Sequence, residues 1–161
     1  FFEAWMVGHW FGEAERTEAD RFIQQHHLES VVSILGVRRQ MAPVYARMDM
    51  LVLPSLRDSF PRVVMEAMCH GIPVVATRVD GIPEMVADGV TGLLVAPGDT
   101  EGFADAAERL LRDPALRARL GAAGRRRAEE LFAPEKYIQA MQDIYRELLP
   151  GLRTGAVRDY A

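Results

Sequence analysis

Cysteine is nearly absent from this sequence, which has one residue of that type, Cys69, among 161. A single cysteine cannot form an internal disulfide, so the composition favours a reducing compartment such as the cytosol. No apolar run approaches the roughly 20 residues needed to span a bilayer. Residues 1–10 also lack the basic start and cleavage site of a signal peptide. We therefore expect a cytoplasmic protein in which Cys69 packs as a small apolar side chain.

An excess of positive charge is lacking too, because 23 acidic residues outnumber 19 lysines and arginines and give a net charge of −4. This balance provides no general attraction to nucleic acid or to an anionic membrane. Arginines cluster between residues 112 and 127, but Glu129 and Glu130 accompany them and aromatic partners are missing. We expect a solvated helix face there and no nucleic-acid partner.

Metal-binding patterns are also missing. The sequence has four histidines, and no pair among them has the spacing that places two ligands on one helix face. They are His9, His26, His27 and His70. We therefore interpret the histidines as surface or core residues and expect no bound metal. We expect no cofactor either.

The stretch that organises the chain is residues 50–96, which predicts strand, helix, strand, short helix and strand. Its three predicted strands, residues 50–54, 73–77 and 92–96, are short apolar runs without alternation, as is typical of strands buried on both faces. Helical spacing of apolar residues fills the gap between the first two runs and stops at Gly71. A right-handed strand–helix–strand unit of this kind indicates a parallel sheet.

The start of that first helix is the candidate binding site. Asp58, Ser59, Phe60 and Pro61 offer capping side chains and a ring-fixed first turn at the carboxyl end of a strand. Ligands of open parallel sheets bind at this end, and the free amides of a helix N-terminus suit a phosphate or diphosphate. Asp58, and Glu66 within the helix, are candidates to bind sugar or ribose hydroxyls. The alternative to ligand binding is that Asp58 and Ser59 only cap the helix and that Glu66 is an ordinary solvated glutamate.

Outside this stretch, periodicity and helix breakers predict two further strands and five further helices. The strands are residues 1–7 and 31–35, and the helices are residues 13–27, 41–47, 100–112, 114–132 and 134–149. We expect Thr100 to cap the first of the last three helices. A composition that is 49% apolar suits one domain, which we place at residues 1–149, with residues 150–161 as a tail.

An ordered series of short motifs resembles the C-terminal domain of the family 4, or group 1, retaining glycosyltransferases of GT-B fold. In this sequence the series is Asp58, Glu66-Ala67-Met68, Gly71, Pro73-Val74-Val75, Gly81-Ile82-Pro83-Glu84, Asp88-Gly89, Thr91–Val95 and Pro97-Gly98-Asp99. The family has glutamate where this chain has Asp58, so the carboxylate here lies about one methylene further from a ligand.

The resemblance implies an α/β fold: a partial Rossmann-like parallel sheet with helices on both faces and a helical C-terminal end. It also implies that the first strand, its helix and the N-terminal domain are missing from this chain. The absent strand would lie between residues 1–7 and 50–54. We therefore expect the 161-residue chain alone to be inactive, and marginally stable or self-associating.

By the same resemblance, the chain is the half of the enzyme that binds a nucleoside-diphosphate sugar. Transfer of a hexosyl group to a sugar, polysaccharide or lipid-linked acceptor would proceed with retention and without metal. Glu66 would bind the ribose hydroxyls and Asp58 the donor-sugar hydroxyls. Backbone amides of the segment Ser59, Phe60, Pro61, Arg62 and Val63 would bind the diphosphate, and Gly36 and Val37 would border the base.

Three other classes stay open at this point. The chain could be a non-catalytic nucleotide-binding module, half of a GT-B sugar-nucleotide epimerase, or a degenerate structural fragment. The epimerase is the weakest, because the motifs at residues 81–84 and 91–95 fit the transferases better. Contact with the inner face of the membrane, through the missing domain, is also left open.

Overall fold

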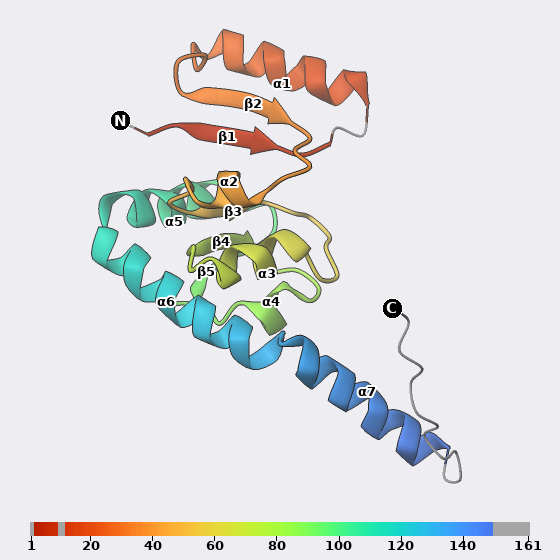
Figure 1. Ribbon diagram of the computed structural model, residues 1–161. Coiled ribbons are helices and arrows are strands. Elements are labelled where there is room, and N and C mark those ends of the chain that lie inside the picture. Colours follow the sequence, from red (N-terminus) through yellow and green to blue (C-terminus); the bar gives the residue numbers. More distant parts are fainter. Residues whose placement is uncertain (1, 10–11, 150–161) are drawn as a thin grey trace. The chain divides into compact units, whose positions relative to one another are not determined.

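The computed structural model describes residues 2–9 and 12–149, and the chain divides into two compact units at residues 44 and 45. The predicted tail, residues 150–161, lies outside the described residues. Figure 1 shows the first unit in red and orange and the second from yellow to blue. Each unit contains its own parallel sheet.

The first unit is one strand–helix–strand motif. It consists of β1 (Ala4–Val7), α1 (Glu13–Gln25) and β2 (Val32–Gly36). The two strands pair in parallel, with Ala4 opposite Val32 and Met6 opposite Ile34. Every residue of β2 is half-buried, and α1 buries none of its residues. The expected helix at residues 41–47 is only a single turn, α2 (Ala42–Tyr45), and the boundary between the units falls just before its last residue.

The second unit holds the three strands and the helices expected between and after them. In chain order they are β3 (Leu51–Leu53), α3 (Arg62–Cys69), β4 (Val74–Thr77), α4 (Ile82–Met85), β5 (Gly92–Val95), α5 (Thr100–Arg112), α6 (Pro114–Leu131) and α7 (Pro134–Leu148). The strands are parallel in the order β3-β4-β5. The predicted succession of elements is therefore confirmed, with shifts of one or two residues at most ends.

The core of this unit forms around β4, whose four residues are all buried. Val75 packs with Leu93 and Val95 of β5 and with Leu110 of α5, in one apolar cluster. Because side chains alternate along a strand, Val74 and Ala76 face the other side of the sheet, where they are equally buried. Both faces are thus covered, as the unalternating apolar runs predicted.

The first two helices after β5 are each capped by an aspartate. Asp99, rather than the expected Thr100, is the N-cap of α5, and its Oδ1 accepts a hydrogen bond of 2.9 Å from the amide of Gly102. Thr100 instead begins the helix. Asp113 caps α6 in the same way, since its Oδ1 accepts from the amide of Leu116 at 2.8 Å. Such caps satisfy amides that have no partner within the helix.

Surface charges on α5 and α6 follow the expectation of a solvated face. Exposed pairs join Arg112 to Glu108 and Arg125 to Glu129, each four residues apart. α7 buries none of its residues and exposes several large apolar side chains: Tyr137, Ile138, Ile144, Tyr145 and Leu148. Cys69 is exposed, so the expectation that it packs as a buried apolar side chain is wrong. None of the described helices has the length and apolar character needed to cross a membrane.

Candidate donor-binding site

The loop between β3 and α3 carries most of the predicted site, but it is not capped as expected. Pro61 is the N-cap of α3, with φ −66° and ψ 111°, and no side chain accepts a hydrogen bond there. Asp58 and Ser59 precede that position, and within the described residues neither makes a side-chain hydrogen bond. The prediction that they cap the helix is therefore wrong, because a buried proline occupies the capping position.

This arrangement leaves backbone donors free at the start of α3. The first amide to donate to the backbone here is that of Val64, which bonds the carbonyl of Pro61 at 3.0 Å. Pro61 itself has no amide hydrogen, so it cannot serve as a donor as its inclusion in the predicted segment implied. In the described part of the chain, the remaining amides of this segment donate to no backbone acceptor: Ser59, Phe60, Arg62 and Val63. Such a set suits an anion.

The turn after β4 holds this loop in place. Asp80, which has a positive φ of 42°, accepts a hydrogen bond of 2.9 Å through Oδ2 from the amide of Asp58. Next to it, Gly81 lies so close that a Cβ built there would be 1.9 Å from the carbonyl oxygen of Ser59. The loop and the turn therefore touch through their backbones, and only glycine permits that approach.

Further contacts hold the loop between β3 and α3 and the turn after β4 in place. Thr77, the last residue of β4, donates its hydroxyl to the carbonyl of Ser55 at the start of the loop. The ring of Phe60 packs edge-on against Phe132, with centroids 5.5 Å apart. Arg127 of α6 donates to the carbonyl oxygens of Glu84 and Met85, each at 2.8 Å. The turn is thus braced through the main chain of Glu84.

Glu66 lies one turn into α3, and both oxygens of its carboxylate accept hydrogen bonds. The hydroxyl of Tyr45 donates to Oε2 at 2.8 Å, and the Arg62 guanidinium donates to Oε1 at 3.3 Å. The Glu66 side chain is 30% exposed, whereas Tyr45 is 4% exposed. The buried Tyr45 hydroxyl and the exposed Arg62 guanidinium thus orient the Glu66 carboxylate, which stays partly accessible to solvent.

Sequence reasoning missed Tyr45, which was only part of a predicted helix. Its ring stacks at a tilt on His70, with centroids 4.9 Å apart. Burial raises the pKa of Tyr45, and the hydrogen bond to Glu66 and its negative charge raise that pKa further, although Arg62 opposes the change. The hydroxyl therefore stays protonated and able to donate. A tyrosine in an otherwise apolar run is the one signal that could have drawn attention to it, since its hydroxyl needs a partner when buried.

The predicted residues divide between the two units. Asp58 to Val63 and Glu66 lie together on the loop and first turns of α3 in the second unit. Gly36, with φ 64°, ends β2 in the first unit, and Val37 follows it with an exposed side chain. Gly36 and Val37 therefore form a separate group at the carboxyl end of their own strand.

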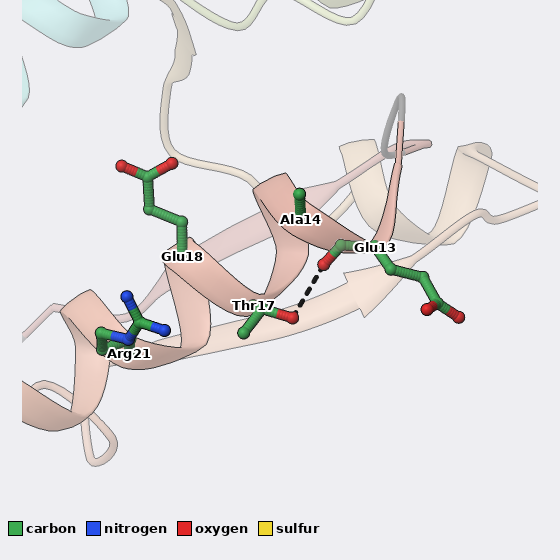
Figure 2. A pocket seen from close by; sticks show the side chains of 5 residues that line it. All are labelled: Glu13, Ala14, Thr17, Glu18 and Arg21. Atoms are coloured by element: carbon green, nitrogen blue, oxygen red, sulfur yellow. Dashed lines mark hydrogen bonds between the residues drawn. The ribbon is translucent and has the colours of Figure 1, made fainter.

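Two open hollows in the surface lie elsewhere. One, of about 490 Å³, runs along α1. Figure 2 shows that the Glu13 and Glu18 carboxylates there point away from each other, while Thr17 donates to the carbonyl of Glu13 at 2.8 Å. The other, of about 420 Å³, lies along β5 and α5. Neither includes a predicted site residue.

In the described part of the chain, no three His, Cys, Asp or Glu residues are arranged to hold a metal ion.

A loop of free amides entering a helix at the carboxyl end of a parallel strand is typical of nucleotide-binding α/β domains. Comparison with known proteins narrows the class. Residues 2–113 match the family described as Glycosyl transferases group 1. The N-acetyl-alpha-D-glucosaminyl L-malate synthase of Bacillus anthracis is 36% identical over 137 residues, which are 85% of this chain and 36% of that protein.

Several solved structures are also similar to this chain. The sucrose-phosphate synthase from Thermosynechococcus elongatus has a TM-score of 0.81 at 34% identity, covering 91% of this chain and 38% of that one. Anabaena HepE in complex with UDP has a TM-score of 0.85 at 29% identity, covering 91% of this chain and 41% of that one. The same protein in complex with UDP-glucose has a TM-score of 0.81 at 28% identity and covers 90% of this chain and 41% of that one.

The chain therefore belongs to the group 1 glycosyl transferases. The expected Rossmann-like α/β fold, with parallel strands flanked by helices, is confirmed. This chain spans 36% to 41% of the length of these relatives.

Proposed function

We propose that the chain binds the nucleoside diphosphate of a sugar donor, as the donor-binding part of a hexosyltransferase. The observation that carries this proposal is the juxtaposition of free loop amides with the oriented carboxylate of Glu66 on the same short helix. The family supports it, and so do the complexes of HepE with UDP and UDP-glucose. The relatives' names mention different acceptors, so we assign none.

Each predicted residue has a distinct place in this proposal. The amides of Ser59, Phe60, Arg62 and Val63 bind the diphosphate, helped by the positive end of the α3 dipole. Pro61 has no amide to offer and instead anchors the start of the helix, where it is buried. Asp58 binds hydroxyls of the donor sugar and Glu66 those of the ribose. Gly36 and Val37 border the base.

The chemistry we propose is transfer with retention at the anomeric carbon, without a metal ion. Charge builds up on the departing diphosphate in such a reaction, and preorganised donors must stabilise it. Amides and a helix dipole supply part of that stabilisation. The proposed cellular location is the cytoplasm, where nucleotide sugars would be the donors.

Replacement of Glu66 by alanine tests the ribose assignment. A hydrogen bond to a charged group contributes about 1.5 to 3 kcal/mol, so Glu66→Ala in the natural protein should weaken nucleotide binding roughly tenfold to a hundredfold. Titration calorimetry with UDP, ADP and GDP would measure this effect. Glu130→Ala is the control, since Glu130 is an exposed helical glutamate outside the site. Equal dissociation constants for wild type and Glu66→Ala would exclude the assignment.

An assay of sugar transfer distinguishes a transferase from a non-catalytic nucleotide-binding module. The natural protein, given UDP-glucose and other nucleotide sugars together with sugar and lipid-linked acceptors, should transfer a hexosyl group. Nucleotide binding that depends on Glu66 without any transfer would favour the non-catalytic module.

A further inference from the structure

Tyr45 and Arg62 both donate to the Glu66 carboxylate, and Tyr45 is the more firmly held of the two. Its hydroxyl reaches Oε2 at 2.8 Å from a position 21 residues earlier in the chain. The tyrosine is 4% exposed, and its ring packs on His70, so the ring has little freedom to turn away. Tyr45 and Glu66 belong to the same unit.

Arg62 holds the other carboxylate oxygen much less firmly. Its side chain is 82% exposed and lies 3.3 Å from Oε1, four residues away on the same helix. Exposed pairs of this kind fix little, because solvent screens them and both side chains keep much of their freedom. The orientation of Glu66 therefore depends mainly on the buried tyrosine.

The hydrogen-bonding capacity of the carboxylate limits what else it can bind. An ionised carboxylate has about four lone-pair positions on its two oxygens. Tyr45 and Arg62 occupy one position on each oxygen. About two positions, one on each oxygen, remain for a ligand. This pattern suits two neighbouring hydroxyls better than a single one.

We propose that Tyr45 is a positioning residue, which holds Glu66 so that its free lone pairs face the two hydroxyls of a ribose. This inference rests on the proposed function, because it assumes that Glu66 binds the donor nucleotide. It adds a substrate preference: the site should select ribonucleotides over 2′-deoxyribonucleotides, and Tyr45 should be needed for that selection.

The test is Tyr45→Phe in the natural protein, which removes the hydroxyl and keeps the ring. The probes are whichever of UDP, ADP and GDP binds most tightly and its 2′-deoxy analogue, measured by calorimetry. Loss of one hydrogen bond predicts that the ribonucleotide binds about three- to tenfold more weakly. The deoxy analogue should lose less, so the ratio of the two dissociation constants should move toward one. Tyr137→Phe, an exposed tyrosine on α7, is the control.

A double-mutant cycle separates positioning from packing. If Tyr45 acts through Glu66, Tyr45→Phe should have no further effect on nucleotide affinity in a Glu66→Ala background. An equal loss in both backgrounds, or an unchanged ribose-to-deoxyribose ratio in Tyr45→Phe, would overturn the inference. Partial unfolding does not obscure the ratio, because it lowers both affinities of one preparation alike.

The two failures are distinguishable. If Glu66→Ala leaves binding unchanged, the ribose assignment of the proposed function fails. If Glu66→Ala weakens binding and Tyr45→Phe does not, only the positioning role of Tyr45 fails.

Discussion

Two residues in the turn after β4 determine where the loop between β3 and α3 lies. Asp80 accepts the amide of Asp58, and Gly81 lies against the carbonyl of Ser59. The turn belongs to the Gly-Ile-Pro-Glu motif, which had no assigned role in the sequence beyond a turn. Its contacts indicate a positioning role, because a shift of this turn would move the amides that are proposed to bind the diphosphate.

Alanine at position 81 should disturb that loop. The added Cβ would lie 1.9 Å from the Ser59 carbonyl oxygen, so one backbone segment must move. We expect a loss of about 1 to 3 kcal/mol in the free energy of unfolding, as for other overpacked sites, and weaker nucleotide binding. Thermal melting and calorimetry would measure both quantities.

Gly12→Ala is a matched control for this prediction. The atom nearest to the new Cβ there would be a carboxylate oxygen of the exposed Glu15, at 2.9 Å, and that flexible side chain can move aside. Wild-type stability and binding in both variants would show that the loop–turn contact has no such role.

At the scale of elements, α6 approaches its neighbours through small residues. A Cβ on Gly121 would lie 2.0 Å from the carbonyl oxygen of Gly71, just beyond α3. A Cβ on Gly124, one turn later, would be no nearer than 3.4 Å to the carbonyl oxygen of Thr91. The two glycines are both buried in one helix, and they differ mainly in the space beside them.

This difference predicts opposite outcomes for the same substitution. Alanine has a helix propensity about 1 kcal/mol better than glycine, so Gly124→Ala should leave stability unchanged or raise it by up to that amount. Gly121→Ala should lower it by about 1 to 3 kcal/mol, because the clash outweighs the propensity. Denaturant unfolding of the two variants checks this, and equal effects would contradict the backbone contact between α6 and the end of α3.

At the scale of the whole molecule, the two units differ in how fully their strands are paired and buried. In the described residues, β4 has a partner on each side and is buried throughout, whereas β1 pairs only with β2 and neither is fully buried. The described strands thus form two separate sheets, with one described neighbour each for β1 and β3.

Hydrogen exchange should reflect this difference. The amides of Val75 and Ala76 should be the most protected, because their exchange needs opening of the core of the second unit. Amides of β1 and β2 should exchange faster, through local opening of a sheet with two strands. Mass spectrometry of exchanged peptides would measure both rates, and equal protection in the two sheets would contradict this prediction.

The sequence by itself determined the elements and the family. Hydrophobic runs without alternation mark buried strands, and glycine and proline mark helix ends, so the five strands of the described residues and their helices could be predicted from local pattern. The ordered motifs from Asp58 to Asp99 were enough to suggest the glycosyltransferase family. These are local properties, which depend on residues near one another in the chain.

The tertiary structure decided the contacts between distant segments and the choice among neighbouring caps. Thr100 was the expected cap, and only the path of the backbone makes its neighbour Asp99 the N-cap instead. Ser59 and Gly81 meet through their backbones, and Tyr45 meets Glu66 through side chains, although each pair is far apart in sequence. No local pattern encodes such pairs, because they form only when Tyr45, α3, the loop before it and the turn after β4 are brought together by packing in the second unit.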